Sequence, residues 1–152
     1  MRRSEVWNRR AMSDRWLYQV RIELDERSAD LARREPSNAA LKPLADILKR
    51  HQATIVCQFV AFADFVADAM SRGAVDDPLF KWTKDTIDDP AKQRRYRRTF
   101  AIHIDGEVIY SKEKADALEA ELQSIVGDKL VTRVTRIDTN PATNPQPMER
   151  YR

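Results

Sequence analysis

The chain has 152 residues, with 27 lysines plus arginines, 24 aspartates plus glutamates and a formal net charge of +3. That length suits one domain with a sizeable core. One cysteine excludes an internal disulfide framework, and three isolated glycines exclude a glycine-rich phosphate loop. Asp64 and Asp68 interrupt the longest apolar stretch, so no membrane-spanning segment is predicted.

The excess positive charge lies at the N-terminus, because residues 16–152 carry as many acidic as basic side chains. Residues 1–14 are predicted to form a flexible basic arm, which lacks the apolar stretch of a signal peptide. A lone thiol fits a cytoplasmic location. Residues 138–152 are rich in proline and are predicted to be a disordered tail. A single α+β domain is expected between them, over residues 15–137.

The first half of this domain predicts a strand, a connection and a helix. Residues 16–24 alternate as in a half-buried strand, which places Tyr18, Val20, Ile22 and Leu24 on one face. Residues 25–37 are predicted to be a polar connection with at most one helical turn, opened by Ser28. Residues 38–51 are predicted to be a helix, whose apolar stripe consists of Leu41, Leu44, Ile47 and Leu48.

The middle of the chain is apolar and then helical. The β-branched and aromatic residues from 54 favour a strand to about Val60, followed by a helix over 63–71 that Gly73 ends. Helical spacing of Phe59, Phe62 and Met70 leaves a helix as the alternative for the strand. Residues 77–89 predict another helix, with an aspartate cap followed by proline.

The second half repeats the pattern of the first. Residues 99–104 alternate as a strand, and Asp105-Gly106 predicts a tight hairpin with a short returning strand over 107–110. Ser111 is expected to cap a helix over 111–126, and residues 130–137 predict a last strand at an edge of the sheet.

Two such units predict an α+β fold, a ferredoxin-like β-α-β-β-α-β antiparallel sheet with two helices on one face. Residues 63–95 would be a helical insertion between the halves. The uncovered face is predicted to be polar, with Gln19, Arg21, Glu23, Ala101 and His103. Because Phe65, Phe80 and Trp82 of the insertion need a surface to bury against, we expect them on that face or against a second subunit, as in a homodimer.

Three groups of side chains suggest sites. His103 and Asp105 lie two apart on a predicted strand, so the aspartate could prepare the imidazole as a general base while Arg21 holds an anion. The favoured interpretation is simpler: Asp105 begins a turn and His103 faces solvent. Cys57 with His51 as base is the second group, but its apolar neighbours favour an inert core thiol.

The third group is a basic run that leads into the strand over 99–104. Its guanidinium groups and aromatic ring could bind phosphates and stack on a base, or neutralise the aspartates upstream, which is the favoured interpretation. Placed on a strand, alternate residues of the run would point to opposite sides. The residues concerned are Arg94, Arg95, Tyr96, Arg97 and Arg98.

These observations favour a dimeric binding module for a ligand or partner, without catalytic activity. One alternative is a small dimeric enzyme that acts on an anionic small molecule, with His103 as general base. Another is weak nucleic-acid binding through residues 94–98 and the N-terminal arm, although the neutral domain argues against nucleic acid as a partner. The sequence predicts no cofactor and no metal site, because its histidines stand apart from each other and no calcium-loop spacing is present.

Overall fold

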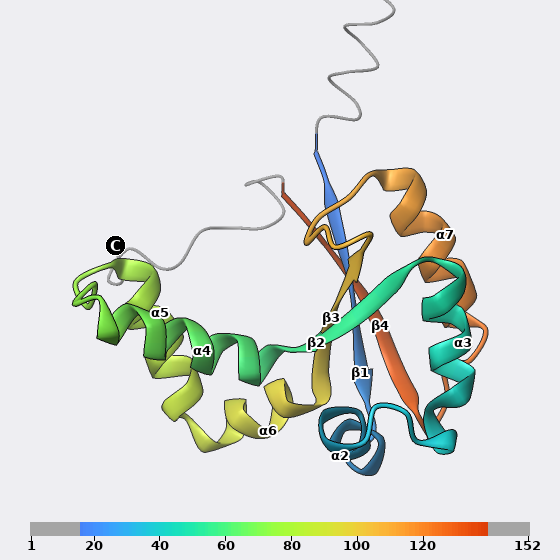
Figure 1. Cartoon of the computed structure of the whole chain (residues 1–152), viewed down its shortest axis with the longest axis horizontal. Coiled ribbons are helices and arrows are strands. Elements are labelled where there is room, and N and C mark those ends of the chain that lie inside the picture. Colours follow the sequence, from blue (N-terminus) through green and yellow to red (C-terminus); the bar gives the residue numbers. More distant parts are fainter. Residues whose placement is uncertain (1–15, 140–152) are drawn as a thin grey trace, which may run out of the picture.

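The computed structural model of the chain describes residues 16–139 (Figure 1). This part of the chain is α+β, with one open sheet of four strands and six α-helices. The elements in chain order are β1 (Tyr18–Leu24), α2 (Glu26–Arg34), the 3₁₀ helix η1 (Ala39–Leu41), α3 (Lys42–Arg50), β2 (Ala53–Cys57), α4 (Gln58–Ser71), α5 (Pro78–Asp88), α6 (Pro90–Arg98), β3 (Thr99–Ile104), α7 (Lys112–Gln123) and β4 (Val131–Asp138). The arm over residues 1–14 and the tail from residue 140 onward lie outside the described residues.

The sheet has the strand order β2-β3-β1-β4, and every neighbouring pair is antiparallel. The prediction of an edge position for the last strand is confirmed, because β4 pairs only with β1. That pairing extends from Tyr18 opposite Asp138 to Leu24 opposite Val131, with one irregularity near Leu24. β4 therefore continues one residue beyond the predicted domain boundary at 137.

The core lies between one face of the sheet and the helices α3 and α7, which lie side by side in Figure 1. Residues of the apolar faces predicted for 16–24 and 38–51 are buried there, together with residues of β3 and α7. They are Val20, Ile22, Leu24, Phe100, Ile102 and Ile104 from the strands, and Leu44, Ile47, Leu48, Ala115, Leu118 and Leu122 from the helices. Each fully buried leucine or isoleucine contributes about 1.5–3 kcal/mol through the hydrophobic effect.

The helices α4, α5 and α6 follow β2 and precede β3 in the chain, and they form a helical arm that projects to one side of the sheet (Figure 1). The predicted strand to Val60 is wrong at its end: β2 stops at Cys57 and α4 begins at Gln58, so the helical excursion is longer than the predicted 63–95. Helical periodicity decides this boundary, because Gln58, Val66 and Ala69 form a buried stripe along α4. The helix ends before Gly73, whose φ of 71° suits glycine.

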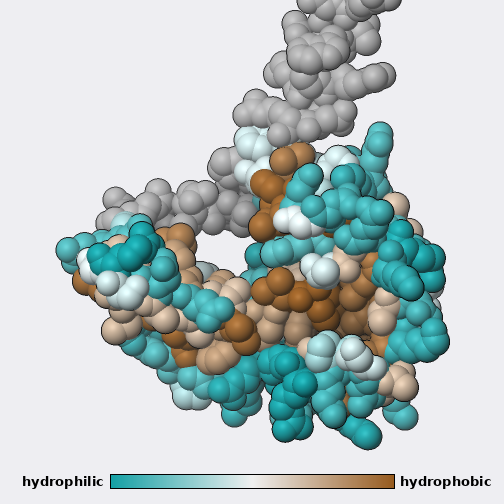
Figure 2. Space-filling model, in the orientation of Figure 1, coloured by the Kyte–Doolittle hydropathy of each residue, from teal (hydrophilic) through white to brown (hydrophobic). Residues whose placement is uncertain are grey.

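The arm has a small core of its own. Val66, Ala69 and Phe80 are buried together, with Phe65 packed against them, and the Phe62 and Trp82 rings meet edge to face at 6.0 Å. These aromatic rings therefore pack inside the arm and not on the open sheet face, while their contact with a second subunit stays a prediction. In Figure 2 the arm and the sheet form two lobes, and apolar residues gather where the lobes join. As predicted, Asp77 caps α5 and Pro78 begins it.

Helix α2 corrects the prediction that residues 25–37 are a polar connection. Asp25 caps the helix: its Oδ1 accepts a hydrogen bond from the Ser28 amide at 2.7 Å, and its Oδ2 accepts one from the Leu130 amide at 2.5 Å. Only Ala29 of α2 is buried. The cap and the link to the loop before β4 therefore stabilise a helix that has no broad apolar stripe.

Replacing Asp25 with asparagine should reduce the loss of stability in acid. The pKa of Asp25 lies below its ordinary value. Burial by itself would raise this pKa, but hydrogen bonds from the Ser28 and Leu130 amides stabilise the charged carboxylate and outweigh the effect of burial. The carboxylate thus stabilises the fold above about pH 4, and this contribution is lost as pH falls further. Urea unfolding at neutral and acidic pH measures the effect. An unchanged pH dependence in Asp25→Asn, matching the exposed control Asp85→Asn, would contradict the prediction.

The turn after β3 forms as predicted, but the returning strand does not. Asp105 and Gly106 have φ values of 53° and 77°, as a two-residue hairpin turn requires. Ile104 pairs with Glu107 and Tyr110 pairs with Tyr18, each as an isolated bridge. The segment instead crosses the end of the sheet and brings the Tyr110 ring into the core.

Helix α7 begins as predicted after its cap, Ser111, and ends at Gln123, short of the predicted residue 126. Among residues 16–139, every helix is too short or too polar to cross a membrane.

Candidate anion-binding site

The basic run is helical, which changes how its side chains are distributed. Asp89 caps α6 by accepting a hydrogen bond from the Ala91 amide at 2.9 Å, and Pro90 occupies the first turn. The run leads into β3, as the sequence suggested, but its residues are helical, so the strand-like alternation considered for their side chains does not apply. Because residues three and four apart share a helix face, Arg94, Arg97 and Arg98 line one hollow, and Arg95 and Tyr96 line another.

The hollow lined by Arg95 and Tyr96 lies on the sheet face opposite the core, beside α6, and has a volume of about 240 Å³. We call it the sheet-face hollow. Strand pairing places Arg21 opposite Thr135, and Glu23 opposite Arg133, on its floor. The residues that line it are Arg21, Ile22, Glu23, Arg95, Tyr96, Thr99, Arg133, Thr135 and Ile137.

Arg21 is half-buried in this hollow and has a neutral partner. Its Nε donates a hydrogen bond to Gln19 Oε1 at 2.7 Å, and within residues 16–139 it has no carboxylate partner. Gln19 is itself buried and donates to the Val108 carbonyl at 3.0 Å, which fixes its orientation. Burial lowers the pKa of Arg21, although nearby Tyr96 opposes the change. A guanidinium nevertheless stays charged at neutral pH, so the hollow holds a positioned cation that pairs with no carboxylate of the described residues.

The other charges make the hollow positive. Arg95 and Arg133 also have no carboxylate partner among the described residues, and the Arg95 guanidinium lies 5.7 Å from the centre of the Tyr96 ring. Glu23 is the hollow's only acidic residue, and it is already paired with Arg98 at 3.2 Å. The Tyr96 ring is held edge to face against Phe62, with ring centres 5.1 Å apart. An anion is the ligand that such a hollow would attract.

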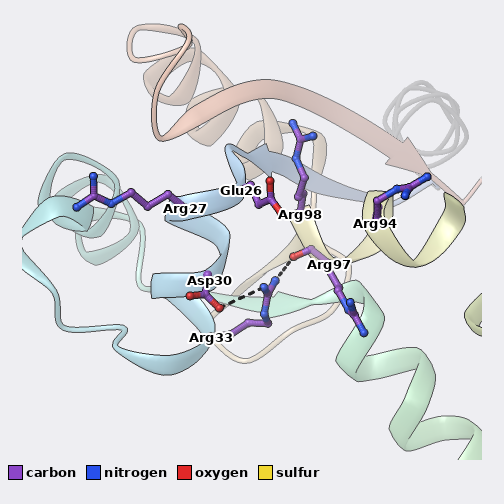
Figure 3. A pocket seen from close by; sticks show the side chains of 7 residues that line it. All are labelled: Glu26, Arg27, Asp30, Arg33, Arg94, Arg97 and Arg98. Carbon is purple, nitrogen blue, oxygen red and sulfur yellow. Dashed lines mark hydrogen bonds and ion pairs between the residues drawn. The ribbon is translucent and has the colours of Figure 1, made fainter. Parts of the chain in front are cut away.

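The second hollow, the α2–α6 cleft, is larger, at about 600 Å³, and is shown in Figure 3. Its residues are Glu26, Arg27, Asp30, Arg33, Arg94, Arg97 and Arg98. Several of its polar groups bind each other: Arg33 pairs with Asp30 at 3.8 Å and donates to the Arg97 carbonyl. The Arg97 guanidinium lies 4.8 Å from the centre of the Phe59 ring. In Figure 3, Arg27 and Arg94 point in different directions, so the cleft does not focus its charges on one point.

The structure does not bring His103 and Asp105 together. His103 is half-buried on β3, opposite Thr54, whereas Asp105 lies in the turn with its Oδ2 3.4 Å from Lys114 Nζ. The positive φ of Asp105 ends the strand alternation on which the pairing was predicted. Asp105 instead lines a separate hollow of about 310 Å³ with His51. The residues that join Arg21 are Arg95 and Tyr96, and His103 does not line the sheet-face hollow.

Cys57 and His51 are also apart. The thiol is 6 % exposed, and its Sγ lies 3.7 Å from the Tyr96 carbonyl oxygen. His51 pairs through Nε2 with Glu121, which also binds Arg50 at 2.7 Å. A hydrogen bond from Arg50, and then one from His51, lower the pKa of Glu121. These contacts tie α3 to α7 and hold the His51 imidazole against Glu121, so His51 is not the base of the Cys57 thiol.

Sequence reasoning missed Arg133 as a site residue. The sequence shows that Arg133, Thr135 and Ile137 share one face of a strand, but it does not show which strand lies beside that one. Only the pairing of β4 with β1 brings Arg133 beside Arg21. Arg27 and Arg33 were missed because α2 was not predicted.

Comparisons of this chain with protein-family models, with curated proteins and with solved structures find no match. Across residues 16–139, no three His, Cys, Asp or Glu side chains gather as metal ligands do. The site is therefore interpreted from its own chemistry. Guanidinium groups, the Thr135 hydroxyl and one aromatic ring suit the binding of an anion.

Proposed function

We propose that this protein is a binding module for an anionic ligand, which the sheet-face hollow holds through Arg21. The observation that carries the proposal is a half-buried guanidinium whose one hydrogen-bond acceptor is a neutral amide oxygen. Removing a charge from water is unfavourable unless an opposite charge compensates it. A phosphate or carboxylate would supply that charge and match the planar fork of arginine with two parallel hydrogen bonds.

The surroundings of Arg21 support this ligand class. Arg95 and Arg133 add positive charge beside it, and Thr135 adds a hydroxyl donor. At about 240 Å³, the hollow is smaller than the roughly 300–1,000 Å³ of typical sites for drug-sized ligands. It suits the charged end of a ligand, with the remainder lying over Tyr96.

We further propose that the sheet has the ferredoxin-like β-α-β-β-α-β arrangement, with the helical arm inserted between its halves. The antiparallel order β2-β3-β1-β4 and the placement of α3 and α7 against one face support this assignment. A homodimer and a cytoplasmic location remain predictions from the sequence. Binding is preferred to catalysis with His103 as base, because Asp105 lies against Lys114 and not against the imidazole.

Replacing Arg21 with glutamine tests the proposal. Inorganic pyrophosphate serves as the probe, and isothermal titration measures its dissociation constant, which should rise about tenfold or more in Arg21→Gln. Arg21→Lys should weaken binding less, because it keeps the charge but loses the fork.

Arg72→Gln is the matched control, because Arg72 is exposed on the arm and paired with Asp68 at 2.8 Å. Circular dichroism verifies that each variant is folded. Wild-type protein that fails to bind pyrophosphate, or an Arg21→Gln variant that binds it as tightly, would contradict the proposal.

A further inference from the structure

We infer that the anionic ligand is a single-stranded nucleic acid, whose backbone crosses α6 from the sheet-face hollow to the α2–α6 cleft. The inference rests on the proposed function and names its ligand. It reverses the expectation, drawn from the neutral composition of residues 16–152, that nucleic acid is not a partner.

The two hollows adjoin each other. Glu23 lines the sheet-face hollow, Arg98 lines the α2–α6 cleft, and their side chains form an ion pair at 3.2 Å. Helix α6 contributes to both hollows, because its arginines lie on more than one face. A ligand that extends over the last turns of α6 would therefore contact both.

The charges are spread in a way that suits a chain of phosphates. Several arginines of the two hollows have no carboxylate partner within residues 16–139: Arg21, Arg27, Arg94, Arg95, Arg97 and Arg133. One small anion would engage only those around Arg21. The divergence of Arg27 and Arg94 in Figure 3, which argues against a single focused site, is expected where successive phosphates are bound at different points.

Charge segregation explains how a neutral domain acquires a basic surface. The helical arm carries exposed aspartates on α4, on α5 and at the cap of α5: Asp64, Asp68, Asp77, Asp85 and Asp88. The basic surface around α6 is thus balanced by acidic residues elsewhere, and the net charge conceals both.

The aromatic ring and the shape of the hollow favour a single strand over a duplex. Tyr96 is half-buried and lines the sheet-face hollow, Phe62 packs against its ring edge to face, and a base would stack on the ring beside or in place of the Arg95 guanidinium, which lies 5.7 Å from the ring centre. Base stacking on such a ring tolerates any base. Arg21 lies half-buried on the sheet surface, where a phosphate must enter the hollow to reach it. A flexible strand can place one phosphate there, whereas the backbone of a rigid duplex cannot bend into it.

Fluorescence anisotropy with labelled oligouridylates tests the inference on the full chain. Affinity should rise from a strand of about 4 nucleotides to one of about 12, because only the longer strand reaches both hollows. The logarithm of the association constant should fall linearly with the logarithm of salt concentration. The slope should become shallower by about 0.7 for each phosphate-binding arginine removed in Arg27→Gln/Arg94→Gln. Tyr96→Ala should weaken the longer strand by about fivefold or more.

Arg50→Gln/Arg72→Gln removes two exposed arginines outside both hollows and is the matched control. Affinity that does not depend on strand length overturns the inference, and so does a duplex that binds as tightly as the single strand. An unchanged salt slope in Arg27→Gln/Arg94→Gln also overturns it. Pyrophosphate, titrated in parallel, separates the two proposals: if it binds through Arg21 while oligouridylate fails, only the nucleic-acid inference falls.

Discussion

Replacing Leu118 with alanine is expected to lower the free energy of unfolding by about 2–5 kcal/mol. Leu118 lies in the middle of α7, is 0 % exposed, and packs in the main core under the sheet. The substitution removes buried methyl groups and leaves a cavity that the surrounding strands cannot fully fill. Urea unfolding followed by circular dichroism measures the loss.

Leu79→Ala is the matched control, because it makes the same chemical change in a helix where the leucine is 46 % exposed. Its effect should stay within about 0.5 kcal/mol. Equal losses for the two variants would mean that the α7 face does not form the core as described.

The second large effect is expected for Tyr110→Phe, which should destabilise the fold by about 1–3 kcal/mol. The buried Tyr110 hydroxyl donates to the Ile102 carbonyl at 2.8 Å and accepts from the Val20 amide at 2.7 Å. It thereby bridges β1 and β3 from within the core. Removing the hydroxyl leaves a buried amide without its acceptor, and this penalty exceeds the gain from a less polar ring.

Tyr18→Phe provides the comparison. Tyr18 is half-buried, its ring centre lies 5.4 Å from the Arg136 guanidinium, and its hydroxyl makes no hydrogen bond within the described residues. Phenylalanine keeps the ring, so Tyr18→Phe should change the unfolding free energy only slightly. If Tyr110→Phe were equally silent in urea unfolding, the bridge between β1 and β3 would have no energetic importance.

The parts of the fold that follow a simple period were predictable. Val20, Ile22 and Leu24 alternate along β1, and Leu118 and Leu122 lie on the stripe of α7, so burial on one face determines both elements. Asp77 followed by Pro78 marks the start of α5, because that pair satisfies a free amide and fixes a helical φ. In these cases the residues within an element are enough to predict it.

Two other elements depend on contacts that no local pattern reveals. Helix α2 buries only Ala29, and its cap residue Asp25 also binds the Leu130 amide, which is far away in sequence. The start of α4 at Gln58 follows residues that suit a strand and a helix equally well. Asp89 was interpreted only as the end of the helix over 77–89, although it also caps α6, so the helix that carries the basic run was not predicted.

Only those parts of the candidate site that follow from local sequence patterns were predictable. Strand phase placed Arg21 on the face away from the core, and the basic run identified Arg95 and Tyr96. Their meeting with Arg133 depends on the order of the strands and on the direction in which α6 approaches β3. Those are properties of the whole fold, and a single sequence does not display them.

The helical arm leaves and rejoins the sheet at neighbouring positions, since Cys57 and Phe100 are paired across β2 and β3. Topologically, the whole excursion is one long hairpin connection, so the hydrogen-bond ladder of the four strands does not pass through it. A tight turn in its place would close the same ladder. Such a shortened protein would keep Arg21 on the sheet while losing Arg95 and Tyr96. It would therefore separate the contribution of the sheet to anion binding from the contribution of α6.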